Sequence, residues 1–227
     1  MIVQLQVRYA HPSMSVKARK RARAGSARAE RAPNARERLL EAAARLFLER
    51  GYHATGVAAV LESAGVHAGS LYHAFADKEA LLCGVLEHYR RILRPVLIEP
   101  VEARESDPIE RVFGLLAFYR HYLVDSDFRH GCPIGNLALE LGDSIPAARA
   151  RIEENFEAWT DAVAGWLAPA RARFPSGTNL RALAGFVLTT MEGGLMLSRA
   201  RRTIEPFDRA VARLREHFEL LQAARGA

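Results

Sequence analysis

The sequence has little cysteine, no long apolar run and none of the motifs of common enzymes. Its two cysteines, Cys83 and Cys132, lie far apart without a CxxC pair, which argues against a disulfide framework or a zinc module. The longest apolar runs are only a few residues, far short of the roughly 20 that span a bilayer. The N-terminus lacks the basic and apolar segments of a signal peptide, so we expect a cytoplasmic protein without a membrane partner.

The motifs of catalysis are also missing. The chain contains no GxxxxGKS loop, no GxSxG elbow and no HExxH helix. His121 and Asp125 are spaced i, i+4, but two ligands do not make a metal site. His130 lies near Cys132 without a visible third group to orient it. A small helical enzyme with Cys132 as its nucleophile is therefore the weaker alternative, and we expect neither a metal nor a cofactor.

Positive charge is concentrated at the N-terminus. Residues 1–33 hold eight Lys or Arg and one Glu, a net charge of +7, which leaves 24 basic and 25 acidic residues in 34–227. This basic arm is low in apolar residues and has no helical stripe, so we expect it to be disordered when free. Basic arms commonly contact nucleic acid, and a non-specific nucleic-acid-binding protein is a third hypothesis. A solubilising tail, or a true start at Met14, remains an open alternative.

From residue 34 onward the pattern is helical, with no competing strand signal, and predicts an all-α fold. Asn34 and Glu37 can form a reciprocal cap, and apolar residues then recur at helical spacing until Gly51. A second, shorter helix is predicted over Val57–Ser63, with Thr55 well placed to cap it.

A sharp turn and a short third helix follow. Gly65 fits the turn of a helix-turn-helix, and the next helix is predicted over about 68–74. Leu71 and Phe75 face a small core in this pattern, which leaves Ser70, Tyr72 and His73 on the other faces. Asp77 is placed to cap the long helix that comes next.

These short motifs stand in a fixed order that resembles the N-terminal DNA-binding domain of the TetR family of repressors, over about residues 34–82 without gaps. They are Gly51-Tyr52, Thr55-Gly56-Val57, Ala64-Gly65-Val66, Gly69-Ser70-Leu71-Tyr72, Phe75 and Lys78-Glu79-Ala80-Leu81. Segments 131–141 and 192–202 are similar to the ligand-domain sequences of one TetR subgroup. The resemblance implies a helix-turn-helix domain over 34–80 and a larger helical ligand-binding and dimerisation domain over 81–227.

The resemblance also implies roles in DNA binding. Thr55 and Tyr72 would donate hydroxyl hydrogen bonds to phosphates, and Lys78 would add a cation at a helix start. The short third helix would enter the major groove, where a small residue lets the backbone approach and polar side chains reach base edges. The candidates there are His67, Ala68, Gly69, Ser70 and His73. Many relatives carry larger residues at Ala68 and Ala74, and packing on the first helix is the alternative for Tyr72 and His73.

The second domain is predicted to hold a small-molecule pocket. Asp107, Pro108 and Glu110 predict a cap, a first-turn proline and a capping box for one helix. Candidate pocket residues, each of which could instead belong to the core, are Phe113, Phe118, Tyr122, Cys132, Asn136, Leu137, Trp159, Phe186 and Met191. Asn136 is the polar residue among them that needs a partner, which a backbone group could supply.

Three further apolar stripes complete the expected helices, over 152–166, over 180–191 and after Pro206. In TetR-like proteins the last two helices pair with those of a second copy, so Leu214 and Phe218 are predicted at a homodimer interface. Gly193 and Gly194 would allow a close helix approach. Closure of the monomer core is the alternative, and periodicity does not decide between the two. The resemblance therefore predicts a homodimeric repressor that a small-molecule effector releases from a palindromic operator in double-stranded DNA.

A further hypothesis is that Cys132 senses electrophiles or oxidants. Arg129 and His130 would favour its thiolate, and Pro133 could open a helix whose N-terminus lowers the thiol pKa further. The alternative is that Cys132 is a small buried apolar residue.

Overall fold

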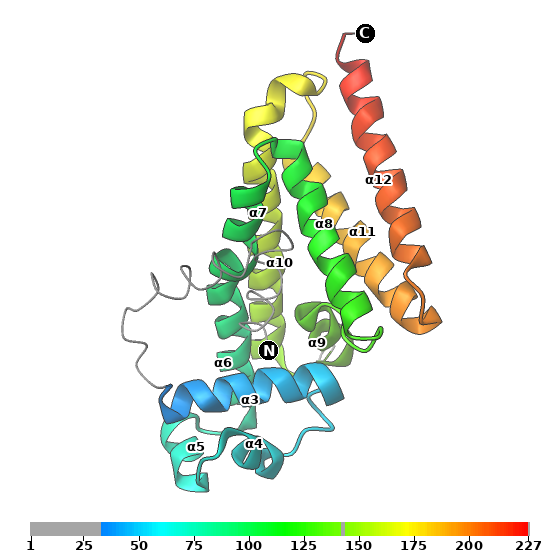
Figure 1. Ribbon diagram of the computed structural model, residues 1–227. Coiled ribbons are helices and arrows are strands. Elements are labelled where there is room, and N and C mark those ends of the chain that lie inside the picture. The colour runs from blue at the N-terminus through cyan, green and yellow to red at the C-terminus, as the bar shows by residue number, and fades with distance from the viewer. Residues whose placement is uncertain (1–32, 142–143, 227) are drawn as a thin grey trace, which may run out of the picture.

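The computed structural model describes residues 33–141 and 144–226, and within these ranges every regular element is a helix (Figure 1). Helix α3 and two short helices form a head at one end, which we define as residues 34–77. Helix α6 joins the head to a larger helical body, and the C-terminus lies at the opposite end of the molecule. The basic arm lies outside the described residues except for Pro33.

The first helix of the head, α3 (Ala35–Arg50), begins and ends as its sequence predicts. Asn34 accepts a hydrogen bond from the Glu37 amide at 2.9 Å, and the Glu37 carboxylate accepts one from the Asn34 amide at 2.8 Å. Gly51 ends the helix with a positive φ of 88°, a conformation that strains other residues. The predicted capping box and glycine stop are confirmed.

Helices α4 (Val57–Ala64) and α5 (Ala68–Ala74) form the predicted helix-turn-helix. Gly65 closes α4 in the left-handed conformation, with φ 61°, and turns the chain into α5. Leu71 and Phe75 are buried as expected. The prediction that Thr55 caps α4 is wrong. Gly56 is the N-cap, without a side-chain hydrogen bond, because the Thr55 hydroxyl turns inward and donates to the Gly51 carbonyl at 2.6 Å.

Helix α6 (Lys78–Leu93) is capped by Asp77, which accepts from the Ala80 amide at 2.7 Å, as predicted. A π-helical segment, η1 (Arg94–Ile98), continues it into α7 (Glu99–Arg104). Asp107 caps α8 (Pro108–Asp125) as expected, but the reciprocal box is wrong because the Glu110 carboxylate pairs with Arg215 instead. The remaining elements are α9 (Pro133–Leu141), α10 (Pro146–Leu167), η2 (Ala168–Arg173), α11 (Leu180–Arg201), α12 (Glu205–Ala223) and η3 (Ala224–Gly226).

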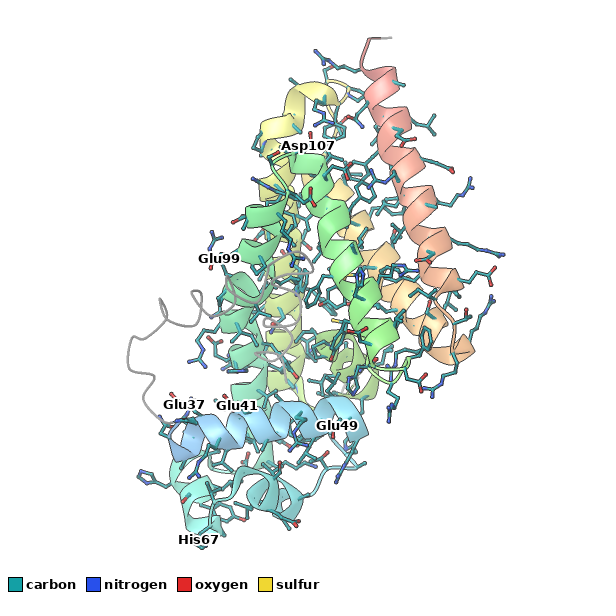
Figure 2. All side chains as sticks on the ribbon, in the orientation of Figure 1. Glu37, Glu41, Glu49, His67, Glu99 and Asp107 are labelled. Carbon is teal, nitrogen blue, oxygen red and sulfur yellow. The ribbon has the colours of Figure 1, made fainter. Side chains whose placement is uncertain are left out.

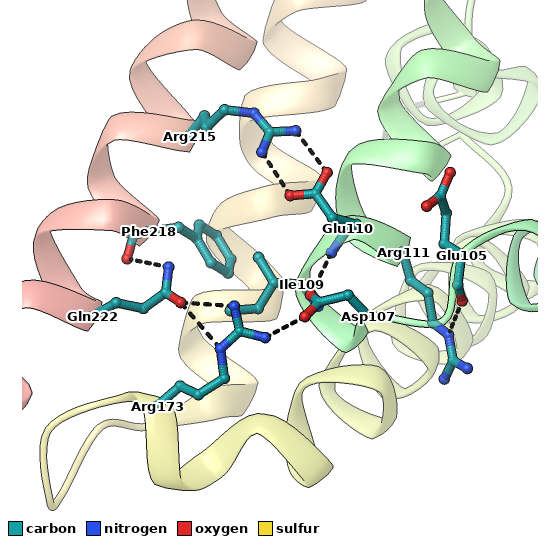
Figure 3. Close-up of polar contacts among 9 residues, drawn as sticks. All are labelled: Glu105, Asp107, Ile109, Glu110, Arg111, Arg173, Arg215, Phe218 and Gln222. Atoms are coloured by element: carbon teal, nitrogen blue, oxygen red, sulfur yellow. Dashed lines mark hydrogen bonds and ion pairs between the residues drawn. The ribbon is translucent and has the colours of Figure 1, made fainter.

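The last helix closes the core of its own chain. Phe218 and Leu214 are each 1% exposed, and the Phe218 ring contacts the rings of Phe113 and Phe174 edge-on. Around them, Arg215 holds the Glu110 carboxylate with two hydrogen bonds, at 2.7 and 3.0 Å (Figure 3). The prediction that Leu214 and Phe218 lie at a homodimer interface is therefore wrong, because both point into the monomer.

Helix α11 has both a buried and an exposed apolar face. It packs between α10 and α12, and a Cβ on Gly194 would lie 3.0 Å from the Phe207 ring, so this glycine lets α11 and α12 approach within one chain. Phe186, Met196 and Leu197 are exposed on its other side. By length and composition α11 is also the one helix of the described residues that could span a membrane, with a third of that window buried.

Candidate DNA-binding head and ligand pocket

Helix α5 presents most of the predicted DNA-contacting residues to solvent. Five of them, His67, Ala68, Gly69, Tyr72 and His73, are exposed, and Ser70 is half-buried. Tyr72 is 63% exposed, so it does not pack against α3. His67 lies at the tip of the molecule, at the end away from the C-terminus (Figures 1 and 2). The short helix is therefore an outward-facing element and not a core helix.

Thr55 is the exception among the predicted DNA contacts. It is fully buried, and its hydroxyl lies against the carbonyls of Gly51 and Leu46, at 2.6 and 3.3 Å. A hydroxyl in this position cannot reach a phosphate without leaving the core, so the expected contact is wrong for this conformation. Thr55 instead fixes the turn between α3 and α4, which sets the position of α5.

Lys78 is half-buried at the start of α6, beside that same turn. Its ammonium donates to the Tyr52 carbonyl at 2.7 Å and lies 4.1 Å from the centre of the Tyr52 ring. Burial lowers the pKa of Lys78 below its ordinary value, while the Glu140 carboxylate acts in the opposite direction. One hydrogen bond occupies one of three ammonium protons, which leaves two for a phosphate.

A carboxylate from the body holds the head at this turn. Glu140, in the last turn of α9, accepts hydrogen bonds from the backbone amides of Tyr52 and His53 at 2.8 and 2.7 Å. A Cβ on Gly51 would lie 2.9 Å from the same carboxylate. Glu140 is 88 residues from Tyr52 and 87 from His53, and no local sequence pattern predicts this contact.

An apolar cavity lies between α6, α8, α9 and α10, with a volume of about 80 Å³. Four predicted pocket residues line it, namely Phe118, Tyr122, Cys132 and Trp159. None of its lining side chains is charged. Sequence reasoning missed Asn155, which also lines the cavity and is 2% exposed.

The other predicted pocket residues lie outside this cavity. Phe113 packs against α12, with the Arg215 guanidinium 3.7 Å from its ring centre, and Leu137 and Met191 are buried elsewhere in the core. Phe186 is 46% exposed on α11. Asn136 accepts a hydrogen bond from Arg199 at 2.6 Å, so its partner is a side chain. Apart from Asn136, these residues share apolar character with the residues that do line the cavity, so composition alone does not distinguish the two groups.

Cys132 lies at the start of α9, which begins at Pro133 as predicted, but it is only 3% exposed. Burial first, and then the nearby Glu192 carboxylate, raise the pKa of the thiol well above its ordinary value. The expectation that Arg129 and His130 favour the thiolate is therefore wrong. In this conformation Cys132 is a neutral, buried thiol that forms part of the cavity wall.

Glu192 is an unsatisfied carboxyl group behind that wall. Its Oε1 is buried without a hydrogen-bond partner, and a Cβ on Gly135 would lie only 2.3 Å from Oε2. Burial raises the pKa of Glu192, and a hydrogen bond with Cys132 opposes this only in part. The raised pKa means that the charged form is less favourable in the folded state than in the unfolded chain, so this carboxyl weakens the fold at neutral pH.

We expect Glu192→Gln to stabilise the protein by about 1 kcal/mol at neutral pH, because it removes a buried charge that lacks a full set of partners. The folded-state pKa is raised, so the loss of stability begins as pH rises past the pKa of the unfolded chain and is complete above the folded-state pKa; below both pKa values there is no loss. The gain should shrink as pH falls. Melting curves against pH, with the exposed Glu153→Gln as control, measure this; a gain independent of pH would contradict it.

The geometry agrees with comparisons to known proteins. Residues 39–83 match the family of bacterial regulatory proteins described as the tetR family, and residues 108–213 match the C-terminal domain of LmrA/YxaF-like transcriptional regulators. A helix-turn-helix transcriptional regulator of Mycobacterium tuberculosis is 32% identical over 191 residues, covering 79% of this chain and 92% of its own. The chain belongs to the TetR family.

Further relatives support this membership. The transcriptional repressor DhaR of a Mycobacterium species is 27% identical, covering 76% of this chain and 86% of its own. The crystal structure of a TetR regulatory protein from Rhodobacter sphaeroides superposes with a TM-score of 0.73 and 25% identity, over 81% of this chain and 98% of that one. TetR-family proteins are DNA-binding transcriptional regulators, typically repressors, and generally act as dimers.

Proposed function

We propose that this TetR-family protein is a homodimeric, cytoplasmic repressor that leaves a palindromic operator when a small molecule fills the cavity of the body. The observation that carries the proposal is the exposure of α5. A seven-residue helix is held by buried Leu71 and flanked by a left-handed Gly65 turn, while its polar side chains face solvent at one end of the molecule. That arrangement suits insertion into a major groove.

A second copy is needed because one short helix reads few bases. Two heads on a twofold axis would engage successive major-groove faces of one operator. The exposed apolar side chains Phe186, Met196, Leu197 and Leu220, on α11 and α12, supply the surface for this association. Gly193 of α11 has open space beside it, so a helix of the second copy could approach there.

Helix α9 offers a physical connection between the cavity and the head. Cys132, Pro133 and Ile134 line the cavity at its first turn, and Glu140 holds the head at its last turn. A ligand that fits better when α9 has moved would favour that position by its difference in affinity. Because Glu140 bonds to the backbone beside Thr55 and Lys78, such a shift would change the orientation of α5.

Substitutions in the head test the proposal. Tyr72→Phe and Lys78→Met should weaken binding of all duplexes alike, by about three- to tenfold each, because each removes one phosphate contact. Ser70→Ala and His73→Ala should instead change which bases are preferred. Binding measured against a library of single-base operator variants separates the two classes. Identical behaviour of both classes would overturn the assignment, and equal binding of every sequence would favour a non-specific nucleic-acid-binding protein.

A further inference from the structure

Asn155 is a buried amide with one unused hydrogen-bonding atom. Its Nδ2 donates to the Leu86 carbonyl at 3.1 Å and to the Arg151 carbonyl at 2.8 Å. Both amide protons are therefore committed, and two carbonyl partners fix which end of the side chain is nitrogen. No residue that the structure describes donates a hydrogen bond to Oδ1.

That oxygen is not fully enclosed by protein atoms. Among the described residues, Glu192 Oε1 is the only fully enclosed side-chain oxygen or nitrogen without a partner. Oδ1 of Asn155 also has no partner and is not one of these enclosed atoms, so open space adjoins it. Asn155 lines the cavity, and we infer that this space is the cavity. Since a buried amide oxygen favours a partner, the cavity holds a fixed hydrogen-bond acceptor.

The rest of the cavity restricts what could donate to it. No lining side chain carries a charge, so a charged ligand would lose its hydration without gaining an ion pair. The volume of about 80 Å³ equals roughly six groups the size of a water molecule, at about 10–15 Å³ each. A single ring matches a space of this size.

Aromatic rings make up much of the cavity lining. Among them, the rings of Phe118 and Tyr122 are nearly parallel, at 9° and 6.4 Å between centres, and the ring centres of Tyr119 and Trp159 lie 5.6 Å apart. Aromatic walls of this kind favour a planar ring, which can pack in offset-stacked or edge-on contacts.

We propose that the effector of this protein is a small, uncharged, single-ring aromatic compound that donates a hydrogen bond to Oδ1 of Asn155. That the compound acts as an effector rests on the proposed function, whereas its chemical class is inferred from the cavity alone. Asn155 also holds the Leu86 carbonyl of α6, the helix that follows the head. The ligand would thus bind the same amide that ties α6 to α10.

Phenol, anisole and benzoate form a matched set of probes. Anisole keeps the ring and loses the donor, and benzoate keeps the ring and adds a charge. The chain has two tryptophans, so in Trp166→Phe the only tryptophan is Trp159, which lines the cavity and reports binding by fluorescence. We expect phenol to bind about tenfold more tightly than anisole, the value of one hydrogen bond, and benzoate to bind more weakly than both.

Two variants locate the site. Asn155→Leu should remove the preference for phenol over anisole, and Ile92→Phe, at the half-buried edge of the cavity, should weaken binding of phenol and anisole together. Asn155→Leu also loses two carbonyl hydrogen bonds and could misfold. The comparison of phenol with anisole needs no change at Asn155 and tests the inference regardless. Equal binding of phenol and anisole, or tighter binding of benzoate, would overturn the inference.

Operator binding then separates this inference from the proposed function. If phenol binds more tightly than anisole and releases the protein from its operator, the ligand class and the proposed function are both supported. If phenol and anisole bind equally and both release the protein, the ligand class is wrong but the repressor function is supported. Phenol that binds at the cavity without releasing the operator overturns the effector role. A protein that binds no operator at all contradicts the proposed function, while the order of the three ligands still decides the class of compound.

Discussion

Replacing Phe218 with glutamate should prevent the chain from folding, whereas the same replacement at Phe186 should leave a folded monomer. Phe218 is 1% exposed and contacts the rings of Phe113 and Phe174. Loss of a buried aromatic side chain costs about 3–5 kcal/mol, and an unpaired buried charge adds to this. The sum is comparable to the whole stability of an ordinary domain, about 5–15 kcal/mol.

Phe186 has a different environment in the monomer. It is 46% exposed on α11, with His217 as its ring neighbour at 5.4 Å. A glutamate there can stay hydrated in the monomer but would lose water and face a second charge at a twofold interface. Circular dichroism should show native helix content for Phe186→Glu, and sedimentation should show a monomer. A folded dimer would move the interface elsewhere, and a folded Phe218→Glu would contradict the packing of α12.

The second large effect is expected at Glu140. Its carboxylate accepts two amide hydrogen bonds from the head, and hydrogen bonds to charged groups contribute about 1.5–3 kcal/mol each when buried. Glu140 is only half-buried, so we discount the pair to about 2 kcal/mol. Glu140→Ala should therefore increase the hydrogen-exchange rates of the Tyr52 and His53 amides by about tenfold or more.

The same variant should loosen the connection between cavity and operator. In Glu140→Ala, phenol should still quench Trp159 fluorescence but should reduce operator affinity much less than in the wild type. Glu153→Ala, which removes an exposed carboxylate on α10, is the matched control. Unchanged amide protection at Tyr52 and His53 would show that Glu140 does not hold the head, and full release by phenol would place the connection in another element.

What could be predicted from the sequence was local. The caps at Asn34, Asp77 and Asp107 each bond within three residues, so their residue types alone indicate helix starts. The glycine turn and the bounds of α5 follow from equally short patterns. Thr55 was misassigned because the fold buries its hydroxyl, a property that no neighbouring residue encodes.

The features that the sequence did not predict depend on contacts between segments far apart in the chain. A helical stripe shows that Phe218 must be covered, but not whether its own chain or a second copy covers it. Burial of Cys132 reverses the effect that its basic neighbours suggest, and burial comes from packing. Glu140 and Asn155 each bond to a backbone group 69 or more residues away, and every residue type carries such backbone groups, so the sequence does not identify these partners.

In the proposed function, α5 contacts DNA bases as one of two symmetry-related recognition helices, and selection from a pool of random duplexes tests this most directly. We predict a near-palindromic consensus whose half-sites lie about one helical turn apart, with two protomers bound to each duplex by mass. Selected sequences without a dyad, or an affinity equal to that for random duplexes, would contradict the claim.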